Sequence, residues 1–168
     1  MPSCDTFDVI PIHNFVQKYL HESKISVDPF ARNKRWATYT NDLNPTTEAE
    51  YHMEACDFLH LLHERGVRPD LALFDPPYSP RQIQECYQSV GKEMGATGAH
   101  NSAAWSVCRD TLAVLCDDDA TVLSFGWNST GMGKKHGFEI VEILLVNHGS
   151  CHNDTICIAE RRHQRRLL

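Results

Sequence analysis

The sequence predicts an α/β fold in which helices cover a doubly wound, mostly parallel sheet. Short apolar runs alternate with stretches of helical periodicity along the chain. Acids follow these runs at regular distances, because Asp28, Asp42, Asp57 and Asp75 are separated by 14, 15 and 18 residues. Each spacing is about one β-α unit. Near the C-terminus, two β-rich runs have a hairpin-like connection.

The elements follow from local patterns. Apolar residues at helical spacing predict an N-terminal helix over 12–21 and further helices around 56–64, 83–90 and 105–115. Gly66 is placed to close the helix over 56–64. Strands are expected at 25–28, 36–41, 71–75 and 121–125, with the two C-terminal runs at 138–146 and 155–159. A short strand at 50–53 is a further expectation, although periodicity alone equally allows one helix over 47–65. Residues 91–101 are expected to form a loop.

Length and composition indicate one globular domain over 1–168, with no separate target-recognition domain. The 168 residues are 42% hydrophobic and 23% charged, which is ordinary for a soluble protein. No run approaches the about 18 apolar residues that a membrane span needs, and the N-terminus lacks a signal pattern. We therefore expect a cytoplasmic protein with no membrane association.

Seven cysteines are an odd number, and four of them lie in amphipathic stretches. Reduced core thiols explain Cys56, Cys86, Cys108 and Cys116 better than a disulfide framework does. Ten histidines include His148 and His152, beside Cys151, but their spacing matches no usual zinc pattern. No metal site is predicted.

The tetrapeptide Asp75-Pro76-Pro77-Tyr78 follows the apolar run 71–74. Prolines have no N–H, so the main chain offers only carbonyl acceptors at this strand end. The Asp75 carboxylate and the Pro76 carbonyl can each accept one N–H of an exocyclic amino group, while Tyr78 covers the attached ring. The four residues are therefore the predicted catalytic residues.

These residues resemble the catalytic motif of amino-methyltransferases, which transfer a methyl group from S-adenosylmethionine to N6 of adenine or N4 of cytosine in DNA. Residues 26–31, 40–45 and 55–59 are similar to the three cofactor motifs of that family. The overall look is of its small phage and prophage members, over roughly residues 25–160. The resemblance implies an antiparallel strand near the C-terminus and a cytoplasm that is bacterial or belongs to a phage-infected cell.

The resemblance also implies cofactor contacts for S-adenosylmethionine. Asp28 would face its methionine end, Asp42 would accept from the ribose hydroxyls, and Asp57 would accept from the adenine amino group. The remaining expected cofactor contacts are Pro29, Phe30, Ala31, Asn33, Leu43, Phe58 and Asp75. The family continues the first motif with glycines, whereas this chain has Ala31-Arg32-Asn33. Asn33 is expected to supply a left-handed backbone conformation there.

The predicted reaction is methyl transfer to N6 of adenine in DNA, with the target base flipped out of the duplex and stacked on Tyr78. Cytosine N4, RNA and a protein amide remain alternatives. So do a non-catalytic scaffold with the same fold and an enzyme that consumes S-adenosylmethionine itself. A net charge of −6 argues mildly against a general nucleic-acid binder, but basic residues cluster at 32–35, 134–135 and 161–166. Because few loops remain to read DNA, we expect a homodimer or a partner subunit, or else a very short site.

Overall fold

The computed structural model describes residues 6–91, 101–149 and 153–163 of the chain. These residues contain one six-stranded sheet with the strand order β2-β1-β3-β4-β6-β5. The neighbours from β2 to β4 are parallel, whereas β6 is antiparallel to both β4 and β5. The strands are β1 (Ser26–Asp28), β2 (Tyr39–Thr40), β3 (Leu71–Phe74), β4 (Thr121–Gly126), β5 (Phe138–Val146) and β6 (Thr155–Arg162). The predicted α/β class and its antiparallel C-terminal strand are confirmed.

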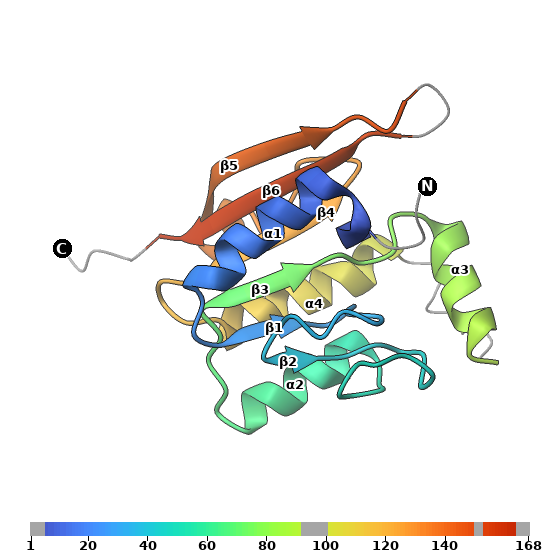
Figure 1. The fold of residues 1–168 in the computed structure, drawn as a ribbon. Helices are drawn as coiled ribbons and strands as arrows, with labels where there is room; N and C mark the ends of the chain where they lie inside the picture. The colour runs from blue at the N-terminus through green and yellow to red at the C-terminus, as the bar shows by residue number, and fades with distance from the viewer. Residues whose placement is uncertain (1–5, 92–100, 150–152, 164–168) are drawn as a thin grey trace.

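Helices lie on both faces of the sheet, while one helix lies beyond the ends of the strands (Figure 1). α1 covers one face, and α2 and α4 cover the other. α3 follows β3 and lies past the tip of its arrow. The helices are α1 (Ile10–Glu22), α2 (Ala55–Glu64), α3 (Pro80–Ser89) and α4 (Asn101–Leu115), with 3-10 turns η1 (Thr6–Asp8) and η3 (Lys134–His136).

The core is divided by the sheet, as strand β3 illustrates. Its four residues are all buried, and successive side chains of a strand point to opposite faces. Leu71 and Leu73 pack in the cluster with α1, whereas Ala72 and Phe74 pack in the cluster with α2 and α4. Burial on both faces explains why this strand is a continuous apolar run without alternation.

The strand order reverses between β1 and β3. The chain runs from β1 outward to β2, and it later returns to place β3 on the other side of β1. In doubly wound sheets, ligands bind beside the carboxyl ends of the strands at such a switch point. Asp28 ends β1 and Asp75 directly follows β3, so both carboxylates lie at this point.

The strand expected at 50–53 is replaced by a single parallel bridge between Asn41 and Tyr51. The Tyr51 N–H donates to the Thr40 carbonyl at 3.0 Å, and the Asp42 N–H donates to the Tyr51 carbonyl at 3.1 Å. The segment thus lies at the sheet edge beyond β2 without forming a regular strand. The alternative of one helix from 47 is wrong, since α2 begins at Ala55.

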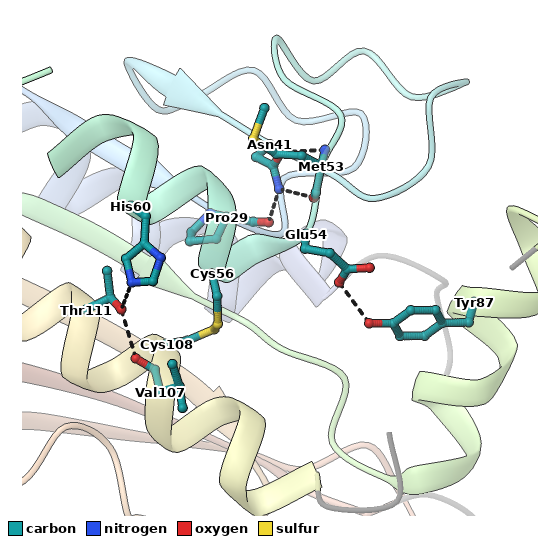
Figure 2. Close-up of a disulfide and its surroundings, with 10 residues drawn as sticks. All are labelled: Pro29, Asn41, Met53, Glu54, Cys56, His60, Tyr87, Val107, Cys108 and Thr111. Carbon is teal, nitrogen blue, oxygen red and sulfur yellow. Dashed lines mark hydrogen bonds between the residues drawn. A yellow bond between two sulfur atoms is a disulfide. The ribbon is translucent and has the colours of Figure 1, made fainter. Parts of the chain in front are cut away.

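The expectation of reduced cysteines is wrong for one pair, because Cys56 of α2 and Cys108 of α4 form a disulfide (Figure 2). Their Cα atoms are 5.1 Å apart. Cys86, Cys116 and Cys157 are free thiols, and burial raises the pKa of Cys116 to about 12. Cys151 lies outside the described residues, as do His152 and most of the loop expected at 91–101. None of the described helices is long and apolar enough to cross a membrane.

Candidate active site

The turn after β1 is held by hydrogen bonds that its backbone N–H groups donate. Asp28 is only 1% exposed, and its Oδ1 accepts the N–H of Phe30 at 3.0 Å. The Ala31 N–H donates to the Asn41 carbonyl at 2.8 Å, which ties the turn to the end of β2. Pro29 and Ala31 are buried. The turn therefore has a fixed path before any ligand binds.

Arg32, and not Asn33, supplies the left-handed backbone conformation in this turn. Arg32 has φ 51°, and it is the one residue other than glycine with positive φ in the described chain. Its N–H donates to Asp42 Oδ2 at 3.2 Å. Asn33 instead accepts the Glu48 N–H at 3.1 Å through its side chain. The expectation for Asn33 is wrong. The left-handed conformation lies one residue earlier, at Arg32, whose N–H binds the Asp42 carboxylate.

Asp42 lies directly after the β2 edge and is half-buried. Besides the Arg32 N–H, it accepts the Asn44 N–H at 2.8 Å through Oδ1. Two backbone donors thus hold its carboxylate at the carboxyl edge of the sheet. Leu43 beside it is also half-buried.

Asn41 is fully buried and connects two site segments, which Figure 2 shows together. Its Nδ2 donates to the carbonyls of Pro29 at 3.1 Å and Met53 at 3.0 Å. Its Oδ1 accepts the Met53 N–H at 3.1 Å. The amide therefore fixes the start of α2 relative to the turn after β1. Sequence analysis assigned Asn41 no role.

Glu54 is the acid that follows the segment paired with β2, and it is the N-cap residue of α2. Its carboxylate is half-buried and accepts the Tyr87 hydroxyl of α3 at 2.8 Å (Figure 2). Burial, together with this carboxylate, raises the pKa of Tyr87 to about 12. Sequence analysis missed Glu54, although the rule that each β segment delivers an acid at its end selects it.

Asp57 and Phe58 do not lie at the strand ends. Asp57 is exposed on the first turn of α2, one turn beyond Glu54. Phe58 is 0% exposed and packs in the core among Val27, Leu62 and Ala72. Its ring lies 5.3 Å from the Tyr51 ring. A residue with no accessible surface offers no face to an adenine, so Phe58 has a core role.

The Asp75-Pro76-Pro77-Tyr78 turn is held by side chains. The Tyr78 hydroxyl donates to Asp75 Oδ1. Burial and the Asp75 carboxylate raise the pKa of Tyr78, so its hydroxyl remains a donor. Gln82 Oε1 accepts the N–H groups of Tyr78 at 2.7 Å and Ser79 at 3.1 Å, within the capping box that starts α3. Pro76 is buried and Pro77 is half-buried.

Aromatic rings flank both acids at the switch point. Trp127 follows β4, is 41% exposed, and meets the Tyr78 ring edge-on with centroids 5.7 Å apart. On the other side, Phe30 contacts the Phe74 ring at 5.6 Å and the Trp105 ring at 5.4 Å. The carboxylates thus lie beside apolar surface that suits planar rings.

Parts of the predicted basic patches are engaged within the protein. Lys34 forms an ion pair with Asp8 at 2.5 Å, and Lys135 lies 3.4 Å from Asp110. Arg162 donates to the Cys116 carbonyl at 3.0 Å and covers the Phe138 ring. Arg32, Arg35 and Lys134 are exposed. Residues 164–166 of the basic tail lie outside the described residues.

Comparison with known proteins identifies the architecture. The sequence matches no family model and no curated protein. A protein from Streptococcus mutans, SMU.1697c, assigned as a methyltransferase and solved in complex with SAH, matches with a TM-score of 0.51 and 7% identity over 88% of this chain and 95% of its own. The assigned methyltransferase yhhF from Escherichia coli gives 0.52 and 10% over 92% and 83%.

A third similar structure is the N-methyltransferase NodS from Bradyrhizobium japonicum, with a TM-score of 0.50 and 8% identity over 92% of this chain and 98% of its own. The chain spans about half the length of two other matched methyltransferases, covering 49% and 48% of them. Because the identities are this low, the likeness concerns the fold. The chain has a methyltransferase fold, with its acids at the strand ends where such sheets bind ligands.

Proposed function

We propose that this protein is an S-adenosylmethionine-dependent methyltransferase acting on an exocyclic amino nitrogen, N6 of adenine in DNA. The observation that carries the proposal is the position of Asp28 and Asp75 at the ends of adjacent strands, at the switch in strand order. Asp28 begins the turn that resembles a cofactor motif, and Asp75 begins the turn that resembles a catalytic motif. Cofactor and acceptor would therefore meet between β1 and β3.

The residues on the β1–β2 side fit the polar groups of the cofactor. Asp42 and Glu54 are half-buried carboxylates at the carboxyl edge, where they suit the ribose hydroxyls and the adenine amino group. Asp28 is too buried to present its carboxylate to solvent, so it would act by holding the turn that faces the methionine end. Asp57 and Phe58 are left out of the proposed contacts in favour of Glu54.

S-adenosylmethionine, when bound, supplies an electrophilic methyl group on its sulfonium. The residues on the β3–β4 side would present the nucleophile. Asp75 and the Pro76 carbonyl would accept the two N–H groups of the amine, which favours a pyramidal nitrogen whose lone pair can attack. Positioning and electrostatics would supply most of the acceleration.

Tyr78 and Trp127 support a planar, flipped base as the substrate. Their rings are in edge contact next to Asp75, and aromatic side chains commonly stack on unpaired bases. The amine can approach Asp75 Oδ1 only after the bond from the Tyr78 hydroxyl is released. The ring would then be available as the stacking surface.

The proposal is tested in two steps. Calorimetry should show S-adenosylmethionine binding without DNA. With tritiated cofactor, the unchanged protein should label duplex DNA, and the Asp75→Ala variant should not. Mass spectrometry of nucleosides from the labelled DNA should find N6-methyladenine. No cofactor binding by the folded protein would contradict the enzyme class. Label only in N4-methylcytosine, RNA or protein amides would keep the class and replace the substrate.

A further inference from the structure

Strand β5 ends the sheet with an open edge and an apolar surface. It pairs with β6 and with no other described strand, and Figure 1 shows it as the outermost strand. Three of its side chains, Ile140, Ile143 and Leu145, are 47%, 56% and 63% exposed. A long apolar edge strand is unusual in a monomer, because unpaired backbone groups beside apolar side chains attract another strand.

The exposed residues lie on the face opposite α1. Glu142 accepts hydrogen bonds from Lys18 at 2.7 Å and Tyr19 at 2.6 Å, both of α1, and Leu144 packs against the same cluster. Because strand side chains alternate, Ile143 and Leu145 point to the other face. Val141 sits in the bulge between Ile140 and Glu142 and is 57% exposed.

The sequence between β4 and β5 explains why this face is bare. Residues 127–137 contain the 3-10 turn η3 but no α-helix, and Asn128 closes a local turn by accepting the Thr130 N–H at 3.0 Å. A doubly wound fold normally covers each face with helices between successive strands. The hairpin of β5 and β6 therefore lacks such a cover on this side.

We propose that β5 is the interface of a symmetric homodimer, in which two copies pair their β5 strands antiparallel and extend the sheet across a two-fold axis at Ile143. A helical partner could cover the apolar face, but it would leave the backbone edge unpaired. A second strand pairs the backbone edge and places apolar side chains beside those of Ile143 and Leu145. The proposal is independent of the reaction proposed above.

The sequence of β5 suits pairing with itself. In this register Ile143 faces its own copy and Val141 faces Leu145, while the bulge after Ile140 ends the regular pairing. Such opposite side chains lie on one face and pack together. Glu142 would face Leu144, so no two like charges are opposed in the paired segment. The strand contains no lysine or proline, and its bulge after Ile140 leaves the segment from Glu142 to Val146 regular.

The contact is expected to be weak. One pair of nine-residue strands buries less than the about 800 Å² per partner of a standard stable interface, so we expect a transient dimer with a micromolar or weaker Kd. Sedimentation velocity of the full chain between about 1 and 100 μM should show a monomer–dimer equilibrium in this range.

Ile143→Lys places two ammonium groups at the axis and should raise the dimer Kd more than tenfold. Val114→Lys is the matched control, because Val114 of α4 is an equally exposed apolar residue at 59%. It should leave the Kd unchanged. Monomers at 100 μM, or an unchanged Kd for Ile143→Lys, would overturn the proposal. Residues 164–168 or another protein would then have to cover the apolar side chains of β5.

A cysteine pair tests the register. Under mild oxidation Ile143→Cys should form a covalent dimer rapidly, whereas Leu145→Cys should do so slowly, because Leu145 faces Val141. Equal rates for the two variants, or faster cross-linking of Leu145→Cys, would exclude the two-fold axis at Ile143. Both measurements are independent of methyl transfer, so their failure leaves the proposed activity untouched.

Discussion

The turn after β1 and the turn after β3 both begin with Asp-Pro, but they are held in different ways. In the first, three consecutive backbone N–H groups are bonded: Ala31 donates to the Asn41 carbonyl, and Phe30 and Arg32 donate to the carboxylates of Asp28 and Asp42. The second contains two prolines without N–H groups, so side chains hold it: Tyr78 binds Asp75, and Gln82 binds Tyr78.

This difference separates a rigid side of the site from an adjustable one. The bond from the Ala31 N–H to the Asn41 carbonyl joins two main-chain groups and can break only if the chain path changes. The bond from the Tyr78 hydroxyl to Asp75 joins two side chains and breaks by rotation about a few bonds. We infer that the turn after β1, on the proposed cofactor side, is formed in advance. The turn after β3, on the proposed acceptor side, would rearrange when a base enters. The following experiments test that contrast.

Asp75→Ala should have the largest effect. Loss of the carboxylate removes the acceptor proposed to orient the amine, and we expect kcat to fall about 10²–10³-fold. Circular dichroism should be unchanged, because Asp75 is half-buried outside the core clusters. Asp75→Asn keeps one acceptor oxygen and should retain more activity. Normal turnover in Asp75→Ala would remove Asp75 from the chemistry.

Asp42→Ala should weaken cofactor binding in the absence of DNA, by roughly 1.5–3 kcal/mol. It removes a proposed charged acceptor and also frees the N–H groups of Arg32 and Asn44. Calorimetry measures the change, with Glu48→Ala as the control because Glu48 is exposed on the same loop. An unaltered Kd in folded Asp42→Ala would show that Asp42 is not a cofactor ligand.

Tyr78 distinguishes stacking from hydrogen bonding. Tyr78→Ala should lower kcat/KM for an oligonucleotide. The loss of transition-state stabilisation should be about 1–3 kcal/mol, the usual value of one base–aromatic stack. Tyr78→Phe keeps the ring but loses the bond to Asp75, so its kcat/KM should stay close to that of the unchanged protein. If Phe is as damaging as Ala, the hydroxyl and not the ring is required.

Arg32→Gly should have the smallest effect, on stability. Glycine adopts positive φ without the steric penalty of a side chain. The free energy of unfolding of Arg32→Gly should therefore be about 1 kcal/mol higher than that of Arg32→Ala. Urea denaturation measures the difference. The same pair of substitutions at exposed Arg35, which has no positive φ, should show no such gain for glycine.

The sequence predicted the features that depend on local patterns. The fold class, the strand before Asp75 and the acids at strand ends follow from apolar runs and their spacing. The choice of Asp57 over Glu54 had another origin: it followed the resemblance of residues 55–59 to a cofactor motif, although the strand expected at 50–53 ends directly before Glu54. The left-handed conformation of Arg32 has no local signal, because its N–H binds Asp42, which lies ten residues away in the sequence.

The pairing of Cys56 with Cys108 could not be predicted either. These residues are 52 positions apart, and each lies in an amphipathic helix where a buried thiol is ordinary. Only the packing of α2 against α4 brings them together. Tertiary contacts of this kind leave no local signature.

This disulfide makes part of the chain a covalent ring. β3, the Asp75 turn and α3 all lie between the two half-cystines, whereas β1 and the β5–β6 hairpin lie outside the ring. In the chain-entropy description, closing a loop of this size restricts the unfolded chain by about 4 kcal/mol. A single peptide cleavage inside the ring would leave one molecule that separates into two fragments only after reduction. The segment with the proposed acceptor site is therefore tethered at both ends.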